Sequence, residues 1–262
     1  MHPFYTKIMA FFALSCALTW FGYLGNAIWP SDNWPTMFPI GPLIAAPIVI
    51  GLTEGRAGLR AWWRRITRLR APARVYAAAF FIPLTIIVAA FGLTVALGAE
   101  LAPLPSYAVS EVLVTIVVLV LVFGPMTEEV SFRGYALDAL QRRLSPLAAS
   151  LWIGAGVVLW HLPLFLTGEL PLTVVMPLAG VAVVYGWLYR AGGCVWPLVI
   201  LHGQLNCVAN LVTGPMMPDR TDQAIYLAIL GVFYLGWAAL IVRFAGPSLA
   251  GRSADAGLPM PI

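Results

Sequence analysis

The long apolar segments of this chain are the feature that most constrains its fold. Eight predominantly apolar stretches follow one another, each close to the length that a helix needs to cross a bilayer. Turn-forming and polar residues separate them. The stretches fall at about residues 8–29, 36–53, 75–98, 108–127, 147–166, 171–190, 194–212 and 223–243, the fourth continuing as a helix to about 143. The sequence therefore predicts an all-α fold, a polytopic membrane helix bundle of about eight transmembrane helices.

Composition excludes the main alternatives. Of the 262 residues, 61% are hydrophobic and only 10% are charged, whereas soluble domains carry about 25% charged residues. A soluble enzyme and a disordered chain are therefore excluded. Cys16, Cys194 and Cys207 lie in apolar stretches without paired spacing, which predicts buried thiols and no disulfide framework. The first apolar run is longer than a signal peptide core and lacks a clear cleavage site, so we predict a retained span.

The distribution of basic residues predicts the orientation. With the N-terminus inside, 14 of the 15 basic residues fall in cytoplasmic segments, and only Arg220 falls outside. Such an excess marks the cytoplasmic side. We therefore predict a multi-pass protein of the inner (plasma) membrane with both termini cytoplasmic. The basic residues assigned to the cytoplasm are Lys7, Arg56, Arg60, Arg64, Arg65, Arg68, Arg70, Arg74, Arg133, Arg142, Arg143, Arg190, Arg243 and Arg252.

Residues 54–74 combine many of these arginines with apolar side chains at helical spacing. The apolar positions are Leu59, Trp62, Trp63, Ile66 and Leu69. The pattern is typical of a helix that lies in the membrane interface, with tryptophans at headgroup depth and arginines on anionic lipid. We interpret it as a topological anchor and predict no nucleic-acid partner.

Ionisable residues inside predicted spans are costly and usually mark function. Glu128, Glu129 and Arg133 lie near the end of the fourth span, His161 lies in the fifth, and His202 and Asn206 lie in the seventh. Glu129 and Arg133 are four residues apart and can form an ion pair, whereas Glu128 points about 100° away. Glu128, His161 and His202 fall at comparable depths, so we predict that three helices converge on one polar pocket.

These residues resemble the three motifs of the CPBP intramembrane proteases. The resemblance covers about residues 110–212 and includes WHLPLF at 160–165 and LHGQLN at 201–206. The family includes CAAX prenyl endopeptidases and bacterial bacteriocin-processing or immunity proteins. Val157 stands where the family usually has Phe. No HExxH, no Gly-x-Ser-Gly and no pair of membrane aspartates is present, which disfavours other intramembrane protease classes.

The residues and the resemblance together predict an intramembrane endopeptidase acting on a membrane-associated substrate, of prenylated CAAX type or bacteriocin-like. Glu128 is expected to activate water with help from His161. Glu129, held by Arg133, is expected to orient the site. His202 and Asn206 are expected to donate hydrogen bonds to the oxyanion, as the resemblance also implies. The predicted partners are membrane lipid and a peptide or protein substrate, and the oligomeric state is not predicted.

Two alternatives stay open. Glu128, His161 and His202 could supply a catalytic zinc site with an open position, although the preferred reading requires no cofactor. Intramembrane Glu and His residues also serve proton relays. A non-enzymatic immunity scaffold or a proton-coupled carrier is therefore the alternative function.

We divide the chain into three parts. Residues 1–106 hold the first transmembrane helices and the basic segment, residues 107–212 form the CPBP-like catalytic core, and residues 213–262 hold the last span and a cytoplasmic tail.

Overall fold

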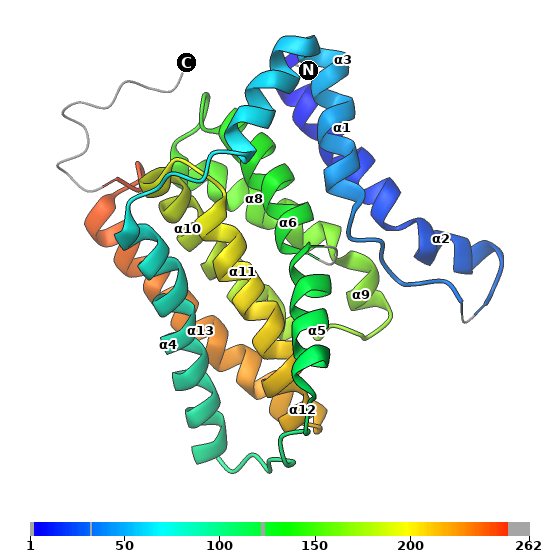
Figure 1. Cartoon of the computed structure of the whole chain (residues 1–262), viewed down its shortest axis with the longest axis vertical. Helices are drawn as coiled ribbons and strands as arrows, with labels where there is room; N and C mark the ends of the chain where they lie inside the picture. Colours follow the sequence, from blue (N-terminus) through cyan, green and yellow to red (C-terminus); the bar gives the residue numbers. More distant parts are fainter. Residues whose placement is uncertain (1–2, 32, 122–123, 251–262) are drawn as a thin grey trace.

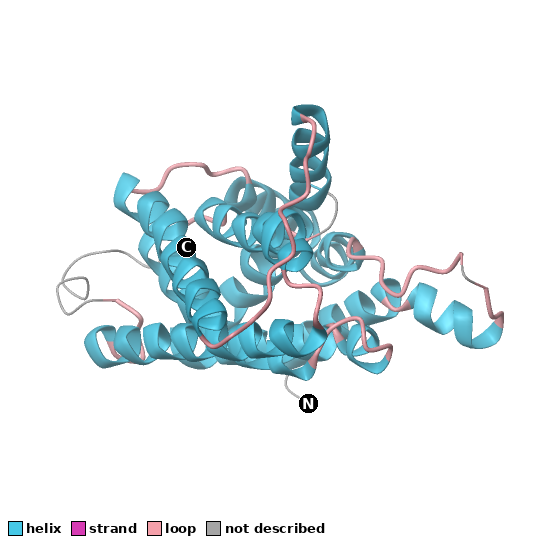
Figure 2. Ribbon diagram, turned by 90° about the horizontal axis from the view of Figure 1, so that it is seen from below, coloured by secondary structure: helices cyan, strands magenta, loops and turns pink. Residues whose placement is uncertain are grey.

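Helices and their connections make up the whole of the described chain, as a computed structural model of residues 3–31, 33–121 and 124–250 shows (Figure 2). No strand occurs in these ranges. Residues 122–123 of the fourth predicted span, Arg252 and the predicted tail from residue 251 onward lie outside them. The helices are α1 (Pro3–Thr19), α2 (Phe21–Ile28), α3 (Gly41–Ile66), α4 (Ala73–Ala96), α5 (Val109–Leu121), α6 (Pro125–Glu128), η1 (Glu129–Leu137), α7 (Asp138–Leu140), α8 (Pro146–Trp160), α9 (Leu162–Leu166), η2 (Leu172–Val174), α10 (Val175–Gly192), α11 (Trp196–Val208), η3 (Ala209–Thr213), α12 (Gly214–Met216) and α13 (Arg220–Ala245).

Several helices are long and apolar enough to cross a membrane, so the protein is an all-α, multi-pass membrane protein. Within the described residues four stretches qualify, namely Ala73–Ala96, Val109–Leu140, Leu172–Gly192 and Arg220–Ala245. A bent pair of helices, Phe4–Thr19 and Phe21–Ile28, would make a fifth. The predicted count of about eight is not confirmed. Part of the difference is length, because α8 has only 15 residues.

Two breaks shape the N-terminal part of the bundle. α1 and α2 are bent by 52°, and α2 with the loop after it projects to one side in both views (Figures 1 and 2). In α3, Gly55 adopts a φ of 63° that disrupts the helix, a conformation that glycine tolerates best. Residues 41–54 pack along α1, whereas residues 56–66 turn away (Figure 1).

The basic segment is helical to Ile66, and its two tryptophans differ in burial. Trp62 is packed against the protein: only 7% of it is exposed, and its indole Nε1 donates to the Val130 carbonyl of η1 at 2.9 Å. Trp63 is 61% exposed, so the two neighbouring tryptophans face different surroundings. The helix face that was assigned to the membrane therefore packs in part against the protein.

α10 lies at the centre and packs against α8 and α13, while α11 packs against α4 and α5 (Figure 1). An aromatic cluster joins the N-terminal helices to this centre, with the Phe132 ring 5.7 Å from Trp160 and 5.8 Å from Phe11. The Trp160 Nε1 donates to the Thr19 hydroxyl at 2.8 Å, and the Trp20 Nε1 donates to the Trp160 carbonyl at 2.8 Å. The end of α8 is therefore fixed to the bend between α1 and α2.

Side-chain caps define the starts of α8 and α13. Ser145 accepts a hydrogen bond from the Ala148 N–H at the start of α8. Asp219 accepts from the backbone N–H groups of Asp222 and Thr221 at the start of α13, and these bonds lower the pKa of its carboxyl. The three cysteines are free; Cys16 and Cys194 are buried as predicted, whereas Cys207 is half-buried.

Candidate active site

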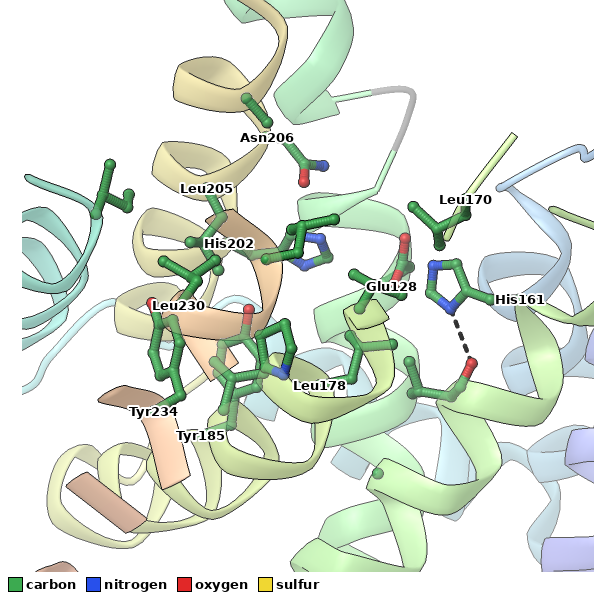
Figure 3. Close-up of a pocket in the computed structure, with 18 of the residues that line it drawn as sticks. Glu128, His161, Leu170, Leu178, Tyr185, His202, Leu205, Asn206, Leu230 and Tyr234 are labelled. Carbon is green, nitrogen blue, oxygen red and sulfur yellow. Dashed lines mark hydrogen bonds between the residues drawn. The ribbon is translucent and has the colours of Figure 1, made fainter. Parts of the chain in front are cut away.

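The polar residues of the predicted spans gather around one cavity in the bundle. A cavity of about 450 Å³ is lined by Glu128, Arg133, His161, His202 and Asn206 together with mainly aliphatic side chains. Glu128 ends α6, Arg133 lies in η1, His161 follows α8, and the other two come from α11 (Figure 3). The predicted convergence of three chain segments is therefore present. Glu129 is the one predicted site residue that does not line this cavity, and it is fully buried behind it.

Glu129 forms the buried ionic centre of the site. Its Oε1 accepts from the Arg133 Nη1 at 3.0 Å and lies 2.9 Å from the His202 Nδ1. Among the described residues its Oε2 has no hydrogen-bond partner. The Arg133 guanidinium also lies 4.4 Å from the centre of the Tyr185 ring, a cation–π contact. Arg133, which packs on Tyr185, thus holds Glu129 and, through it, the ring of His202.

Glu128 has different surroundings from its neighbour. Within the described ranges it makes no ion pair, and it lines the cavity between His161 and His202 (Figure 3). Consecutive residues of a helix point in different directions. This difference places one carboxylate in the cavity and the other in the protein interior.

Both histidines turn one ring nitrogen to a fixed partner. The His161 Nδ1 is 2.8 Å from the Val157 carbonyl (Figure 3). A carbonyl only accepts, so this Nδ1 carries a proton, and the Nε2 of the neutral ring is left as an acceptor. The His202 Nδ1 faces the Glu129 carboxylate, which likewise favours a proton on Nδ1. A hydrogen bond from the His202 Nε2 to an oxyanion would therefore require the doubly protonated ring.

Gly124 lies where three of the polar side chains meet, and the sequence analysis did not select it. Its φ is 128° and its ψ is −91°, a conformation that L side chains rarely adopt. A methyl group on its Cα would lie 2.8 Å from the Asn206 Nδ2, 3.3 Å from the Glu128 Oε1 and 3.6 Å from the His202 Nε2. The backbone at Gly124 is therefore packed directly against the site. The Gly-Pro pair before the glutamates was the available signal, because it marks a turn.

A second cavity opens on the other side of the same residues. It has a volume of about 550 Å³, and Glu128, His161, His202 and Asn206 line it too. Its opposite wall comes from the loop between α2 and α3 and from the turn after α9. These wall residues are Trp34, Pro35, Thr36, Met37, Pro39 and Glu169. We call this second cavity the mouth. The site thus lies between an apolar cavity and a mouth of mixed polarity.

The arrangement does not fit the zinc alternative as predicted. Over the part of the chain that the structure describes, no three His, Cys, Asp or Glu side chains are close enough together to hold one metal ion. Glu128, His161 and His202 all line the cavity but do not form such a group. We therefore derive no step through a metal.

The basic segment of α3 contributes contacts that the sequence analysis also missed. η1 is a π-helix, a wide turn that is frequent at functional sites. Trp62 donates to the Val130 carbonyl, and the Arg65 Nη1 donates to the Gly134 carbonyl at 2.8 Å. The Arg65 Nη2 also pairs with Asp138 at 2.9 Å. We call Trp62 and Arg65 the latch, because they hold the helix that carries Glu129 and Arg133.

Comparison with known proteins assigns the segment that holds these residues to a protein family. A comparison with curated proteins finds no matching sequence. Residues 110–208 match the family model described as type II CAAX prenyl endopeptidase Rce1-like. The match includes Glu128, Glu129, Arg133, His161, His202 and Asn206. Residues 110–208 are therefore a domain of the Rce1-like type II CAAX prenyl endopeptidase family, which is a family of peptidases.

Proposed function

We propose that the protein is an intramembrane endopeptidase in which Glu128 activates the water that attacks the peptide bond of a membrane-associated polypeptide. The observation that carries the proposal is the contrast between the two glutamates. Glu129 is committed to Arg133 and His202, whereas Glu128 makes no ion pair in the described ranges and lines both cavities. A general base must be able to reach the proton that it takes.

The other side chains have roles that follow from their partners. His161 accepts through Nε2 and assists Glu128 at the water. Glu129 and Arg133 hold the His202 ring, and His202 with Asn206 stabilises the negative charge that develops on the carbonyl oxygen. The leaving amine takes its proton from the same carboxyl group that received it from water, so the enzyme returns to its starting state.

The orientation is part of the proposal. The asymmetry of the basic residues supports an inner-membrane protein with about eight spans and both termini in the cytoplasm.

The test of the function is substrate capture with a variant that binds but does not cut. E128Q keeps the shape of the side chain and removes the base. We expect it to retain membrane polypeptides that mass spectrometry identifies, and we expect the wild-type protein to cleave a synthetic peptide from the captured segment while E128Q does not. E129Q is the matched control: it weakens a buried ion pair, so the yield of folded protein should fall, whereas E128Q should keep a normal yield. Normal cleavage by E128Q would overturn the proposal.

The metal-free mechanism makes a separate prediction. N206A should lower kcat by about 10²–10³-fold, the usual cost of one oxyanion donor. Exhaustive chelation should leave activity unchanged, and elemental analysis should find no stoichiometric zinc. One zinc per chain that is lost in H161A, with activity restored only by added metal, would overturn the metal-free step and leave the peptidase intact.

A further inference from the structure

The mouth and the arginine-rich segments lie at opposite ends of the same helices. The loop before α3 and the turn before η2 and α10 form the mouth wall. The basic residues follow at the other ends, with Arg64 and Arg65 in the last turn of α3 and Arg190 in the last turn of α10. α10 has 18 residues and therefore separates its two ends by about 27 Å.

Among the described residues, the wall of the mouth contains no Lys or Arg, and its charged residue besides Glu128 is Glu169. The Thr36 hydroxyl donates to the Glu169 carboxylate across the mouth. In the proposed orientation the basic residues mark the cytoplasmic side, which places the mouth on the other side.

The mouth also explains how water and peptide reach residues at this depth. α8 has 15 residues and is about 22 Å long, shorter than the hydrocarbon core of about 30 Å. His161, at its end, is therefore below the membrane surface. An extended peptide carries unpaired N–H and C=O groups, which are costly in an apolar environment. The mouth offers polar side chains, whereas the first cavity is mainly aliphatic.

We infer that substrates enter through the mouth from the non-cytoplasmic face of the membrane. The substrate class is an extended outer segment of an exported or membrane-inserted polypeptide, cleaved close to its membrane anchor. This inference rests on the proposed function and on the proposed orientation.

The test introduces one cysteine at the mouth and one at the arginine-rich end. In a background without native cysteines, T36C and R64C are treated in intact bacterial cells with a membrane-impermeant maleimide that carries a polyethylene glycol chain. T36C should react in intact cells, whereas R64C should react only after permeabilisation. The cysteine-free parent is the control for unspecific labelling. Reaction of T36C only after permeabilisation would overturn the inference.

A second readout measures the entrance itself. The rate at which each unlabelled variant, T36C or R64C, cleaves the captured peptide is the reference for that same variant after labelling. After labelling, T36C should lose at least about 10-fold in kcat/KM, and R64C should be unchanged. Fully labelled T36C that cleaves at the unlabelled rate would overturn entry through the mouth. If the unlabelled parent does not cleave, the proposed function fails, and the labelling pattern alone then decides which side the mouth faces.

Discussion

Two neighbouring glutamates have different surroundings because a single residue step along a helix turns a side chain by about 100°. Glu129 is enclosed with a cation and a histidine, and removal of Arg133 would leave its buried charge uncompensated. Glu128 borders both cavities. At the residue scale, the site therefore separates a carboxylate that holds the structure from one that is available to a substrate.

Gly124 gives a sharp prediction at the same scale. G124A would place a methyl group 2.8 Å from the Asn206 Nδ2 at a φ of 128°, so either the backbone or the site must move. A displacement of about 1 Å in a catalytic group costs about 10²-fold in rate. We expect a loss of about that size in kcat, measured on the captured peptide.

The matched control is G92A, because a methyl group at Gly92 in α4 would have no atom within 4 Å. G92A should keep both yield and kcat. Equal kcat in G124A and G92A would show that the close packing of the Gly124 backbone against the site does not affect catalysis.

At the scale of elements, the π-helix depends on a segment far from it in sequence. Trp62 and Arg65, the latch, bond to carbonyls at Val130 and Gly134. Both donors come from α3 after the break at Gly55. The basic segment therefore has two faces, one with exposed Trp63 and one that holds the active-site helix.

The latch is tested by W62F. This variant keeps most of the ring and removes the Nε1 donor, which leaves a buried carbonyl unpaired at a cost of about 1–3 kcal/mol. Because the carbonyl belongs to η1, we expect kcat to fall several-fold with KM nearly unchanged. W63F, at a side chain that is 61% exposed, is the control and should leave kcat unaltered. A fall in thermal stability of W62F without any change in kcat would limit the latch to a structural role.

At the scale of the whole molecule, the matched segment 110–208 is not separate from the rest. Trp160, inside it, bonds to Thr19 and accepts from Trp20, both from the N-terminal helices. These bonds are next to His161, so the helices outside the matched segment help to position a candidate catalytic residue.

A double-mutant cycle measures this connection. W160F and T19V each remove one side of the buried hydrogen bond and should each cost about 1–3 kcal/mol, because each leaves the other group unpaired. The double variant should cost less than the sum of the two. Thermal unfolding in detergent is the measurement, with W152F on the exposed side of α8 as the control. Fully additive costs would show that the two residues do not interact.

The sequence by itself determined the fold class and the identity of the polar residues. Continuous apolar runs long enough to cross a bilayer favour helices, because a helix satisfies every backbone group within its own segment. The spacing of Glu129 and Arg133 placed them on one helix face, because residues four apart in a helix are neighbours on its surface. These predictions needed no information about distant parts of the chain.

Only the tertiary structure decided what depends on distant contacts. Helix breaks at Gly55 and between α1 and α2 are not visible in apolar periodicity, so the run lengths that suggested eight spans did not reveal them. The burial of Trp62 beside the exposed Trp63 follows from which face meets η1. The role of Gly124 and the existence of the mouth likewise arise where segments more than 70 residues apart meet. The local sequence pattern shows which face of a helix is apolar. Tertiary packing determines which neighbouring element covers that face.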